Sequence, residues 1–245
     1  MNQNCISHWL PILQAAGIPV PKTVILQVQD GNDLVSILDG VLPPGWESLM
    51  ASIHAAVLEV GGYPAFLRTG QTSNKHDWKN SCFLANKDAI GSHVANLVEF
   101  SHMCDIMGLA HDVFAVREFL DLDTAFTSFA DFPVNRERRA FIRDHKLLCL
   151  HPYWPEGAVA KGRPEDVDWK KKLATLNTDS ADDVRELTAL IDMAAAAFDG
   201  FWSVDFAKTA DGRWLCIDMA DGEQSFHWLE CPFCPESMRQ MYGED

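Results

Sequence analysis

Residues 202–220 read WSVDFAKTADGRWLCIDMA, and their pattern is the strongest structural signal in the chain. Two apolar runs flank Asp211-Gly212, a dipeptide that favours two-residue hairpin turns because both turn positions take positive φ. The pattern therefore predicts an antiparallel hairpin. If Asp211 and Gly212 form the whole loop, Asp205 pairs directly with Asp218, and both side chains lie on one face of the sheet.

The predicted facing of Asp205 and Asp218 needs an explanation, because like charges directly opposed destabilise a hairpin. One explanation is a bound divalent cation, and Mg²⁺ favours carboxylates together with nucleotide phosphates. The alternative is a solvated face on which the pair is merely tolerated. Apolar neighbours on both strands favour the metal site. Asp221 and Glu223, just beyond the second strand, are candidates to complete its ligands.

Outward from this hairpin, helices and strands alternate early in the chain and strand hairpins dominate later, which predicts an α+β fold. Helices are predicted at 7–16, 47–60, 87–107 (closed by Gly108) and 182–198, strands at 23–28, 64–68 and 111–122, and a hairpin of 138–144 with 146–154. The polar stretch 156–180 is predicted to be a long, mobile connection.

The composition limits the class of protein. With 245 residues, 47% of them hydrophobic, one large domain or two closely packed lobes are expected. A formal charge of −15 argues against a sequence-independent nucleic-acid binder. The apolar runs are too short to cross a bilayer, and the first residues lack the basic region of a signal peptide. Seven cysteines in apolar contexts favour reduced thiols, so we expect a cytoplasmic protein without a membrane partner.

The CPFC of residues 231–234 has the spacing of a zinc knuckle or a redox pair. His227 is nearby, but a full zinc site needs another ligand from afar, such as Cys5. Ordinary reduced cysteines near the end of the chain are the favoured interpretation, and the roles of Cys231 and Cys234 stay open.

A second polar stretch, FLRTGQTSNKHDW (66–78), runs from a strand-like start into a glycine, hydroxyl and amide groups, and bases. An ordinary surface loop has this composition too. The acidic hairpin later in the chain favours a loop that holds phosphate. In the ERRAF of residues 137–141, strand alternation puts Arg139 on the same side as Glu137, where a buried ion pair without a catalytic task is the alternative.

With GIPVPKT (17–23), VREF (116–119) and HPYW (151–154), these segments resemble the ATP-grasp superfamily. The resemblance is to the small phage and bacterial ATP-grasp proteins, which are distantly similar to eukaryotic translation-initiation-factor assembly chaperones. It rests on the order of the segments along nearly the whole chain. It implies an ATP-grasp fold in which two α+β lobes clamp the nucleotide. We assign 1–115 to the N-terminal region and first lobe, and 116–245 to the second lobe with the metal-binding hairpin.

The resemblance also implies which residues bind the nucleotide. Arg68 matches a basic residue, more often lysine, that contacts the phosphates, and Lys75 supplies charge in a loop that closes over them. Glu118 and Phe119 match the hinge beneath adenine and ribose. The full set of implied nucleotide-binding residues is Arg68, Thr72, Ser73, Lys75, Glu118 and Phe119.

For catalysis the resemblance implies Lys75, Glu137 and Arg139, with the arginine facing the reacting phosphate. Asp205 and Asp218 match the metal ligands. Many relatives end the metal motif with an asparagine where this chain has Ala220. Either Asp221 or Glu223 substitutes for it, or a second metal is weaker or absent.

The implied activity is that of a ligase using ATP and Mg²⁺ to activate a carboxylate as an acyl phosphate. The substrate is then a small-molecule or peptide carboxylate, and an amine or other nucleophile is the acceptor. One alternative is an ATP-binding assembly chaperone, or another partner-binding protein, with little turnover. An RNA-directed ligase is a third interpretation, which the negative charge disfavours.

Overall fold

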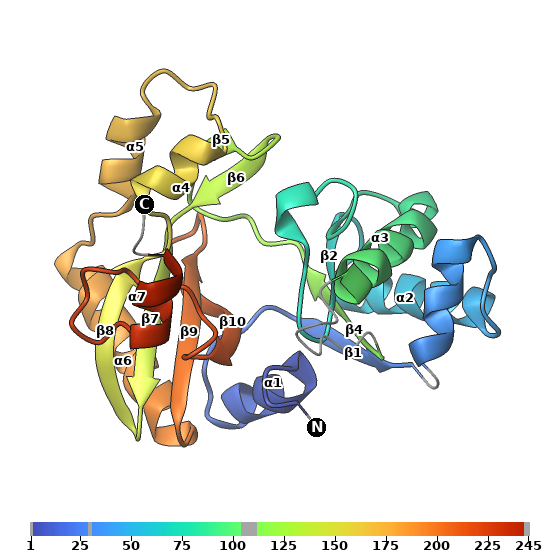
Figure 1. The fold of residues 1–245 in the computed structure, drawn as a ribbon, viewed down its shortest axis with the longest axis horizontal. Coiled ribbons are helices and arrows are strands. Elements are labelled where there is room, and N and C mark those ends of the chain that lie inside the picture. The colour runs from blue at the N-terminus through green and yellow to red at the C-terminus, as the bar shows by residue number, and fades with distance from the viewer. Residues whose placement is uncertain (1, 29–30, 104–111, 243–245) are drawn as a thin grey trace. The chain divides into compact units, whose positions relative to one another are not determined.

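The computed structural model describes residues 2–28, 31–103 and 112–242 (Figure 1). The chain divides into two compact units. The N-terminal unit comprises Cys5–Ser7 and Pro21–Leu120, and the C-terminal unit comprises Met1–Asn4, His8–Val20 and Asp121–Asp245. Each unit has its own four-stranded sheet.

The N-terminal unit is an antiparallel sheet of order β1-β4-β2-β3 with helices packed on it. Its strands are β1 (Thr23–Gln27), β2 (Ala65–Thr69), β3 (Phe83–Leu84) and β4 (Val113–Glu118), and its helices are α2 (Trp46–Val60), α3 (Ile90–Met103) and the 3₁₀ helices η1 (Gly31–Asp39), η2 (Lys75–Asp77) and η3 (Lys87–Ala89). Helix α2 packs on β4 and β1, and α3 packs on β2. The core between them includes Ile53, Leu67, Val94 and Phe114, all fully buried.

The C-terminal unit is built on an antiparallel sheet of order β10-β9-β7-β8, with a separate two-stranded sheet of β5 and β6. Its elements are α1 (Ile6–Ala15, mostly in this unit), β5 (Thr124–Ser128), β6 (Phe132–Asn135), β7 (Glu137–Arg143), β8 (Lys146–Pro152), α4 (Glu156–Lys161), α5 (Trp169–Leu176), α6 (Ala181–Ala197), β9 (Phe201–Lys208), β10 (Trp214–Asp221) and α7 (Glu236–Tyr242). Helix α6 packs on β7 and β8. It begins with a capping box of Ser180 and Asp183, which satisfies backbone N–H groups at its start.

The α+β class is confirmed, and several elements lie where the sequence predicts them. The β7–β8 hairpin turns at Asp144 and His145, both with positive φ, as a tight hairpin requires. The predicted lobe boundary between residues 115 and 116 falls inside strand β4. The whole of β4 lies within the N-terminal unit. The predicted helix at 87–107 is η3 followed by α3, and its predicted end at Met107 and Gly108 lies outside the described residues.

The prediction of a mobile connection at 156–180 is wrong. The segment forms helices α4 and α5, which pack against the β5–β6 sheet. Trp169, Leu173 and Leu176 recur at helical spacing and join Phe126 and Trp154 in an apolar cluster. Charged residues on the other sides of α5 hide this pattern in the sequence.

The β9–β10 hairpin pairs Asp218 with Asp205, which confirms the predicted facing of the two aspartates. The predicted cause is wrong, because the loop is longer than two residues and the first pair is Trp214 with Lys208. If the pairing continued unbroken from Trp214 and Lys208, Asp205 would face Ile217. A β-bulge between Cys216 and Asp218 inserts one residue and brings Asp218 opposite Asp205.

Among residues 2–28, 31–103 and 112–242, the helices are all too short or too polar to cross a bilayer.

Candidate functional site

One row of cross-strand partners runs across the sheet of the C-terminal unit. Along β8, β7, β9 and β10 it carries His151, Arg139, Asp205 and Asp218. Directly opposed residues in antiparallel strands place their side chains on the same face. This face therefore presents an imidazole, a guanidinium and two carboxylates side by side.

The other face of the sheet is the core side, covered by α6. Side chains that alternate with the polar row, such as Ala140, Val204 and Phe206, are fully buried. Lys208 lies two residues beyond Phe206, on the same face, and forms an ion pair with Asp183 of α6. This contact confirms that α6 packs on this face of the sheet. The alternation of β7 and β9 thus separates an apolar face from the polar row.

Arg139 and Asp205 form a bidentate ion pair at the centre of the row. Arg139 Nε lies 2.7 Å from Asp205 Oδ1, and Nη2 lies 2.7 Å from Oδ2. Arg139 also donates to the carbonyl of Phe226 at 3.2 Å, and its guanidinium lies 4.8 Å from the centre of the Tyr153 ring. Burial alone lowers the pKa of Arg139, but the charge and hydrogen bonds of Asp205, with a smaller effect of Asp218, raise it further than burial lowers it. The guanidinium is a fixed positive charge.

Glu137 and Asp218 lie on the same face as this ion pair. Glu137 precedes Arg139 by two positions on β7, is 4% exposed, and accepts a hydrogen bond from Asn135 Nδ2 at 3.4 Å. Asp218 is opposite Asp205 and accepts a hydrogen bond from the backbone N–H of Met219 at 3.1 Å. The structure therefore brings together four of the predicted site residues: Glu137, Arg139, Asp205 and Asp218.

Asp221 and Glu223 are not brought to this group. Asp221 pairs with Trp202 three positions beyond Asp218, so strand alternation puts it on the opposite face. Its carboxylate accepts hydrogen bonds from Gln3 Nε2 and from the backbone N–H of Glu223. Glu223 is paired with Arg143, which lies four residues from Arg139 along β7, or roughly 13 Å away.

Asp205 and Asp218 offer the hard oxygen donors that Mg²⁺ prefers. The bidentate bond to Arg139 uses two of about four lone-pair sites on Asp205, so this carboxylate keeps acceptor capacity. Within the described part of the chain, no group of three metal-ligating side chains forms around the pair. The donor chemistry thus fits a cation that is held by two carboxylates and completed by phosphate oxygens or water.

In the N-terminal unit, Arg68 lies on β2 with 3% of its surface exposed. Its Nε donates to the carbonyl of Thr69, and Arg68 pairs with Ala115 of β4. Thr72 closes a tight turn directly after the strand, because its carbonyl accepts from the backbone N–H and the hydroxyl of Thr69. The predicted phosphate loop therefore starts from a fixed strand end.

The rest of that loop is a short 3₁₀ turn. Lys75 begins η2 directly after Asn74, which has a φ of 49° in the left-handed region. Ser81 ties the turn down by donating to the carbonyls of Asn74 and Asp77. The pKa of His76 is lowered by burial and by the charge of Lys75. Thr72, Ser73 and Lys75 are half-buried.

Glu118 and Phe119 lie at the end of β4. The Glu118 carboxylate accepts from the backbone N–H of Lys22 at 2.7 Å, which joins the start of β1 to the end of β4. Phe119 packs edge-on against Phe83, with ring centres 5.0 Å apart, and is 38% exposed. Their predicted contact with adenine and ribose stays a prediction.

The sequence did not reveal a second cluster in the C-terminal unit. Cys231 lies with His227 beside Cys149 and His151 of β8, and neither Cys5 nor Cys234 belongs to this group. The available signals were the C-x-H of 149–151 on a strand and the H-x₃-C of 227–231. Neither pattern shows which distant segment the other one meets.

Comparison with known proteins identifies the family. The family described as an ATP-grasp domain, family 3 of its clade, matches residues 59–228, more than half of the chain. This range includes the polar loop after β2 and the row on β7, β9 and β10. The comparison with curated proteins gives no match.

Solved structures with a similar fold have low sequence identity. Cdc123 from Schizosaccharomyces pombe is 11% identical with a TM-score of 0.57, over 89% of this chain and 83% of that one. A RimK domain protein ATP-grasp from Sphaerobacter thermophilus is 17% identical with a TM-score of 0.48, over 89% of this chain and 59% of that one. An N5-carboxyaminoimidazole synthase from Aspergillus clavatus, in complex with ADP and 5-aminoimidazole ribonucleotide, is 14% identical with a TM-score of 0.48, over 89% and 44%.

This chain therefore spans less than two thirds of the length of the RimK domain protein and of the synthase. The likeness to Cdc123, with its higher TM-score, supports the fold and nothing more. The match of the family over residues 59–228 carries the assignment. The chain belongs to the ATP-grasp domain family, in family 3 of the matching clade.

Proposed function

We propose that this chain is an ATP-dependent ligase that activates a carboxylate as an acyl phosphate. One observation carries the proposal: Glu137, Arg139, Asp205 and Asp218 share one sheet face inside the segment that matches the ATP-grasp family. Fixed positive charge beside a pair of carboxylates suits the binding of Mg²⁺ and the stabilisation of charge on a transferring phosphoryl group.

In this proposal Asp205 and Asp218 hold Mg²⁺, whose role is to bind and neutralise phosphate oxygens. Arg139 stabilises the negative charge of the transferred phosphoryl group. Its ion pair with Asp205 fixes the guanidinium in place, so little reorganisation is needed at the moment of reaction. Glu137, two residues away on the same face, helps to orient the reacting groups.

The N-terminal unit contributes the other nucleotide contacts in this proposal. Arg68 and Lys75 supply positive charge to the phosphates, and Thr72 and Ser73 supply hydroxyl and backbone donors. Glu118 and Phe119 contact the ribose and adenine. Support comes from the loop that begins at a fixed strand end and from the family match, which includes all six residues.

The reaction has two steps. An oxygen of the substrate carboxylate attacks the γ-phosphorus of ATP, the bond to the bridging oxygen breaks, and ADP leaves. An amine or another nucleophile then attacks the acyl carbon, and inorganic phosphate leaves with the electron pair of the broken C–O bond. A small-molecule or peptide carboxylate is the proposed substrate class. A cytoplasmic location fits the free cysteines, which need reducing conditions.

A second candidate is an ATP-binding protein that holds a protein partner with little turnover. The observation that favours it is the likeness to Cdc123, which covers 83% of that chain with a TM-score of 0.57. By the resemblance stated above, such proteins are assembly chaperones. Retained metal and phosphate residues fit both functions.

Incubation of the purified protein with ATP, Mg²⁺ and pooled amino acids, metabolites and tRNA separates the two functions. The ligase predicts ADP and phosphate release that depends on one carboxylate component, with no AMP. The Asp218→Asn variant should show none of this release, and Lys171→Ala, an exposed position on α5, should match the wild type. Tight binding of MgATP without release in any pool would favour the partner-binding protein. Failure of calorimetry to detect MgATP binding at millimolar concentration would contradict both.

A further inference from the structure

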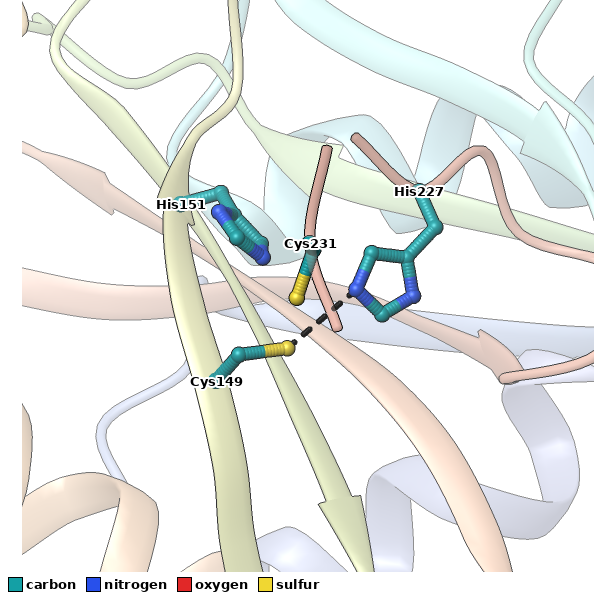
Figure 2. A group of neighbouring side chains, drawn as sticks. All are labelled: Cys149, His151, His227 and Cys231. Carbon is teal, nitrogen blue, oxygen red and sulfur yellow. Dashed lines mark hydrogen bonds between the residues drawn. The ribbon is translucent and has the colours of Figure 1, made fainter. Parts of the chain in front are cut away.

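Two cysteines and two histidines meet on the polar face of the C-terminal sheet. Cys149 and His151 come from β8, where residues two apart share a face, and His227 and Cys231 come from the segment after β10. Figure 2 shows the four side chains directed toward one another, with the ring of His151 pointing toward the Cys231 sulfur. Segments almost eighty residues apart in sequence thus supply two ligand atoms each.

The geometry of the cluster is close to that of a tetrahedral metal site. One ligand atom from each residue lies within 4.8 Å of all the others, and Cys149 Sγ lies 3.2 Å from His227 Nε2. A zinc ion with bonds of about 2.3 Å to sulfur and about 2.0 Å to nitrogen separates its ligands by roughly 3.3–3.8 Å. Side-chain shifts of about an ångström therefore suffice to close the site around an ion.

A second observation concerns the burial of the polar atoms. Cys231 is 7% exposed and His227 is 0% exposed. His151 Nε2 is buried and has no hydrogen-bond partner within the described ranges of the chain. A buried polar atom without a partner carries a desolvation cost, which coordination of a metal removes.

Aromatic packing holds the two histidines in position. The ring of His227 stacks on Phe141 with centres 3.8 Å apart and planes 7° apart, and the ring of His151 stacks near Trp228 with planes 13° apart. Trp228 Nε1 in turn donates to the carbonyl of Pro152 at the end of β8. Both imidazoles are thus oriented by packing, as the ligands of a preformed metal site are.

We infer that Cys149, His151, His227 and Cys231 form a zinc site of Cys₂His₂ type. Two thiolates with two imidazoles select zinc over the hard cation Mg²⁺, which prefers oxygen ligands. Four protein ligands fill the coordination shell, so the site is structural rather than catalytic. Its ligands are separate from the carboxylate pair of Asp205 and Asp218, and the inference does not rest on the proposed ligase activity.

The role of this zinc site is to clasp the C-terminal segment to the edge strand β8. The C-terminal segment also contacts the ion pair on this face, because the carbonyl of Phe226, next to the ligand His227, accepts a hydrogen bond from Arg139. A clasp at His227 and Cys231 therefore fixes one of the contacts that orient the guanidinium. Apolar packing of Cys234 and Met238 continues the attachment beyond the ligands.

Metal analysis of the intact chain tests the inference. The protein is expressed with added zinc and purified under reducing conditions. Its zinc content per chain is then measured by inductively coupled plasma mass spectrometry. We expect about one zinc per chain, as four ligands of one site require. Cys149→Ser and Cys231→Ser should each lower the zinc content at least about tenfold, because the thiolate is the ligand and serine replaces it poorly.

Cys234→Ser is the matched control, since Cys234 is equally buried and three residues from Cys231 but outside the cluster. It should keep the wild-type zinc content. Loss of zinc in Cys234→Ser together with retention in Cys231→Ser would overturn the assignment of ligands.

Cobalt substitution of the wild-type protein keeps the test decisive if a variant fails to fold. Co²⁺ added to the metal-free, reduced chain should give the intense visible bands of a tetrahedral site and a thiolate charge-transfer band, both removed by one equivalent of zinc. Absence of stoichiometric Co²⁺ and Zn²⁺ binding would overturn the zinc site. So would a Cys149–Cys231 disulfide in protein isolated without oxygen, detected by peptide mass spectrometry.

Discussion

Two groups of side chains lie on one face of the same sheet and differ in ligand chemistry: the acidic row of Arg139, Asp205 and Asp218, and the Cys/His cluster of Cys149, His151, His227 and Cys231. The row of Arg139, Asp205 and Asp218 has charged groups and hard oxygen donors on three adjacent strands. The cluster has soft sulfur and imidazole donors, two of them from a segment outside the sheet. The row suits Mg²⁺ with phosphate, and the cluster suits a closed zinc site.

This difference shows what strand pairing does for a site. In the row, each side chain is set beside the next by the register of β7, β9 and β10, so strand alternation and strand pairing place the neighbours. In the cluster, His227 and Cys231 reach β8 because the chain after β10 folds back over the sheet and stacks on Phe141. No local pattern encodes that return.

Loss of Arg139 should have the largest effect on stability. Arg139→Ala leaves the Asp205 carboxylate, 5% exposed, without its ion-pair partner and opposite Asp218. We expect a loss of about 3–5 kcal/mol in the free energy of unfolding, measured with denaturant, because a buried charge is left uncompensated. Arg143→Ala is the control on the same strand and face, since its pair with Glu223 is exposed, and it should cost no more than about 1 kcal/mol. Equal losses in both variants would show that burial of the central pair has no energetic importance.

Loss of Arg68 tests the proposed nucleotide contacts of the N-terminal unit. Arg68→Ala should weaken MgATP binding by about 10- to 100-fold, the equivalent of one or two charged hydrogen bonds, as measured by calorimetry. Arg68→Lys should keep part of the affinity, because it retains the charge without the planar fork. Wild-type affinity in Arg68→Ala would remove this residue from the phosphate contacts.

A carboxylate on the core side of the sheet provides a contrast to Asp218. Asp183 accepts from Ser180 and Trp214 and pairs with Lys208. Burial alone would raise the pKa of Asp183, but its partners hold the net pKa well below the usual range. Asp183→Asn should therefore cost roughly 1–3 kcal/mol at neutral pH.

The pH dependence of this loss follows from the lowered pKa. A carboxylate with a depressed folded-state pKa stabilises the fold above its unfolded pKa of about 3.9, and this stability is lost as the pH falls toward the folded value. The difference in unfolding free energy between wild type and Asp183→Asn should thus be constant from pH 7 to 5 and shrink below about pH 4. A difference that stays constant down to pH 2 would contradict the assigned charge interactions.

Much of the fold was predictable from short-range signals. Asp144-His145 marked the β7–β8 turn, and Gly61-Gly62 marked the end of α2, where Gly61 has a φ of 127°. The helix α5 was missed because its three apolar residues become meaningful only against Phe126 and Trp154, which lie elsewhere in the chain.

The candidate site was predictable in part for a similar reason. Alternation along a strand placed Glu137 beside Arg139, and pairing placed Asp205 beside Asp218. The bulge before Asp218 has no signature in the sequence, so the correct pair was predicted through an incorrect loop. Asp221 was expected to join Asp218 from its proximity in sequence, but strand alternation turns it to the other face.

Asp218→Asn should have the smallest effect on the stability of the protein without nucleotide. The change removes one of two facing negative charges while Arg139 still pairs with Asp205. We expect a free energy of unfolding equal to wild type or higher by a few tenths to about 1 kcal/mol. A structural carboxylate with essential hydrogen bonds would instead cost roughly 1–3 kcal/mol.

The most direct test of the acidic row is denaturant unfolding of wild type and Asp218→Asn, each with and without MgATP. A ligand that binds only the folded state stabilises it by mass action, so MgATP should raise the unfolding free energy of the wild type. We expect Asp218→Asn to be as stable as wild type without ligand and to gain little stability from MgATP, because an amide replaces a carboxylate poorly at a hard cation. A variant that is destabilised without ligand, yet gains as much from MgATP as the wild type, would contradict a metal-binding role for the row.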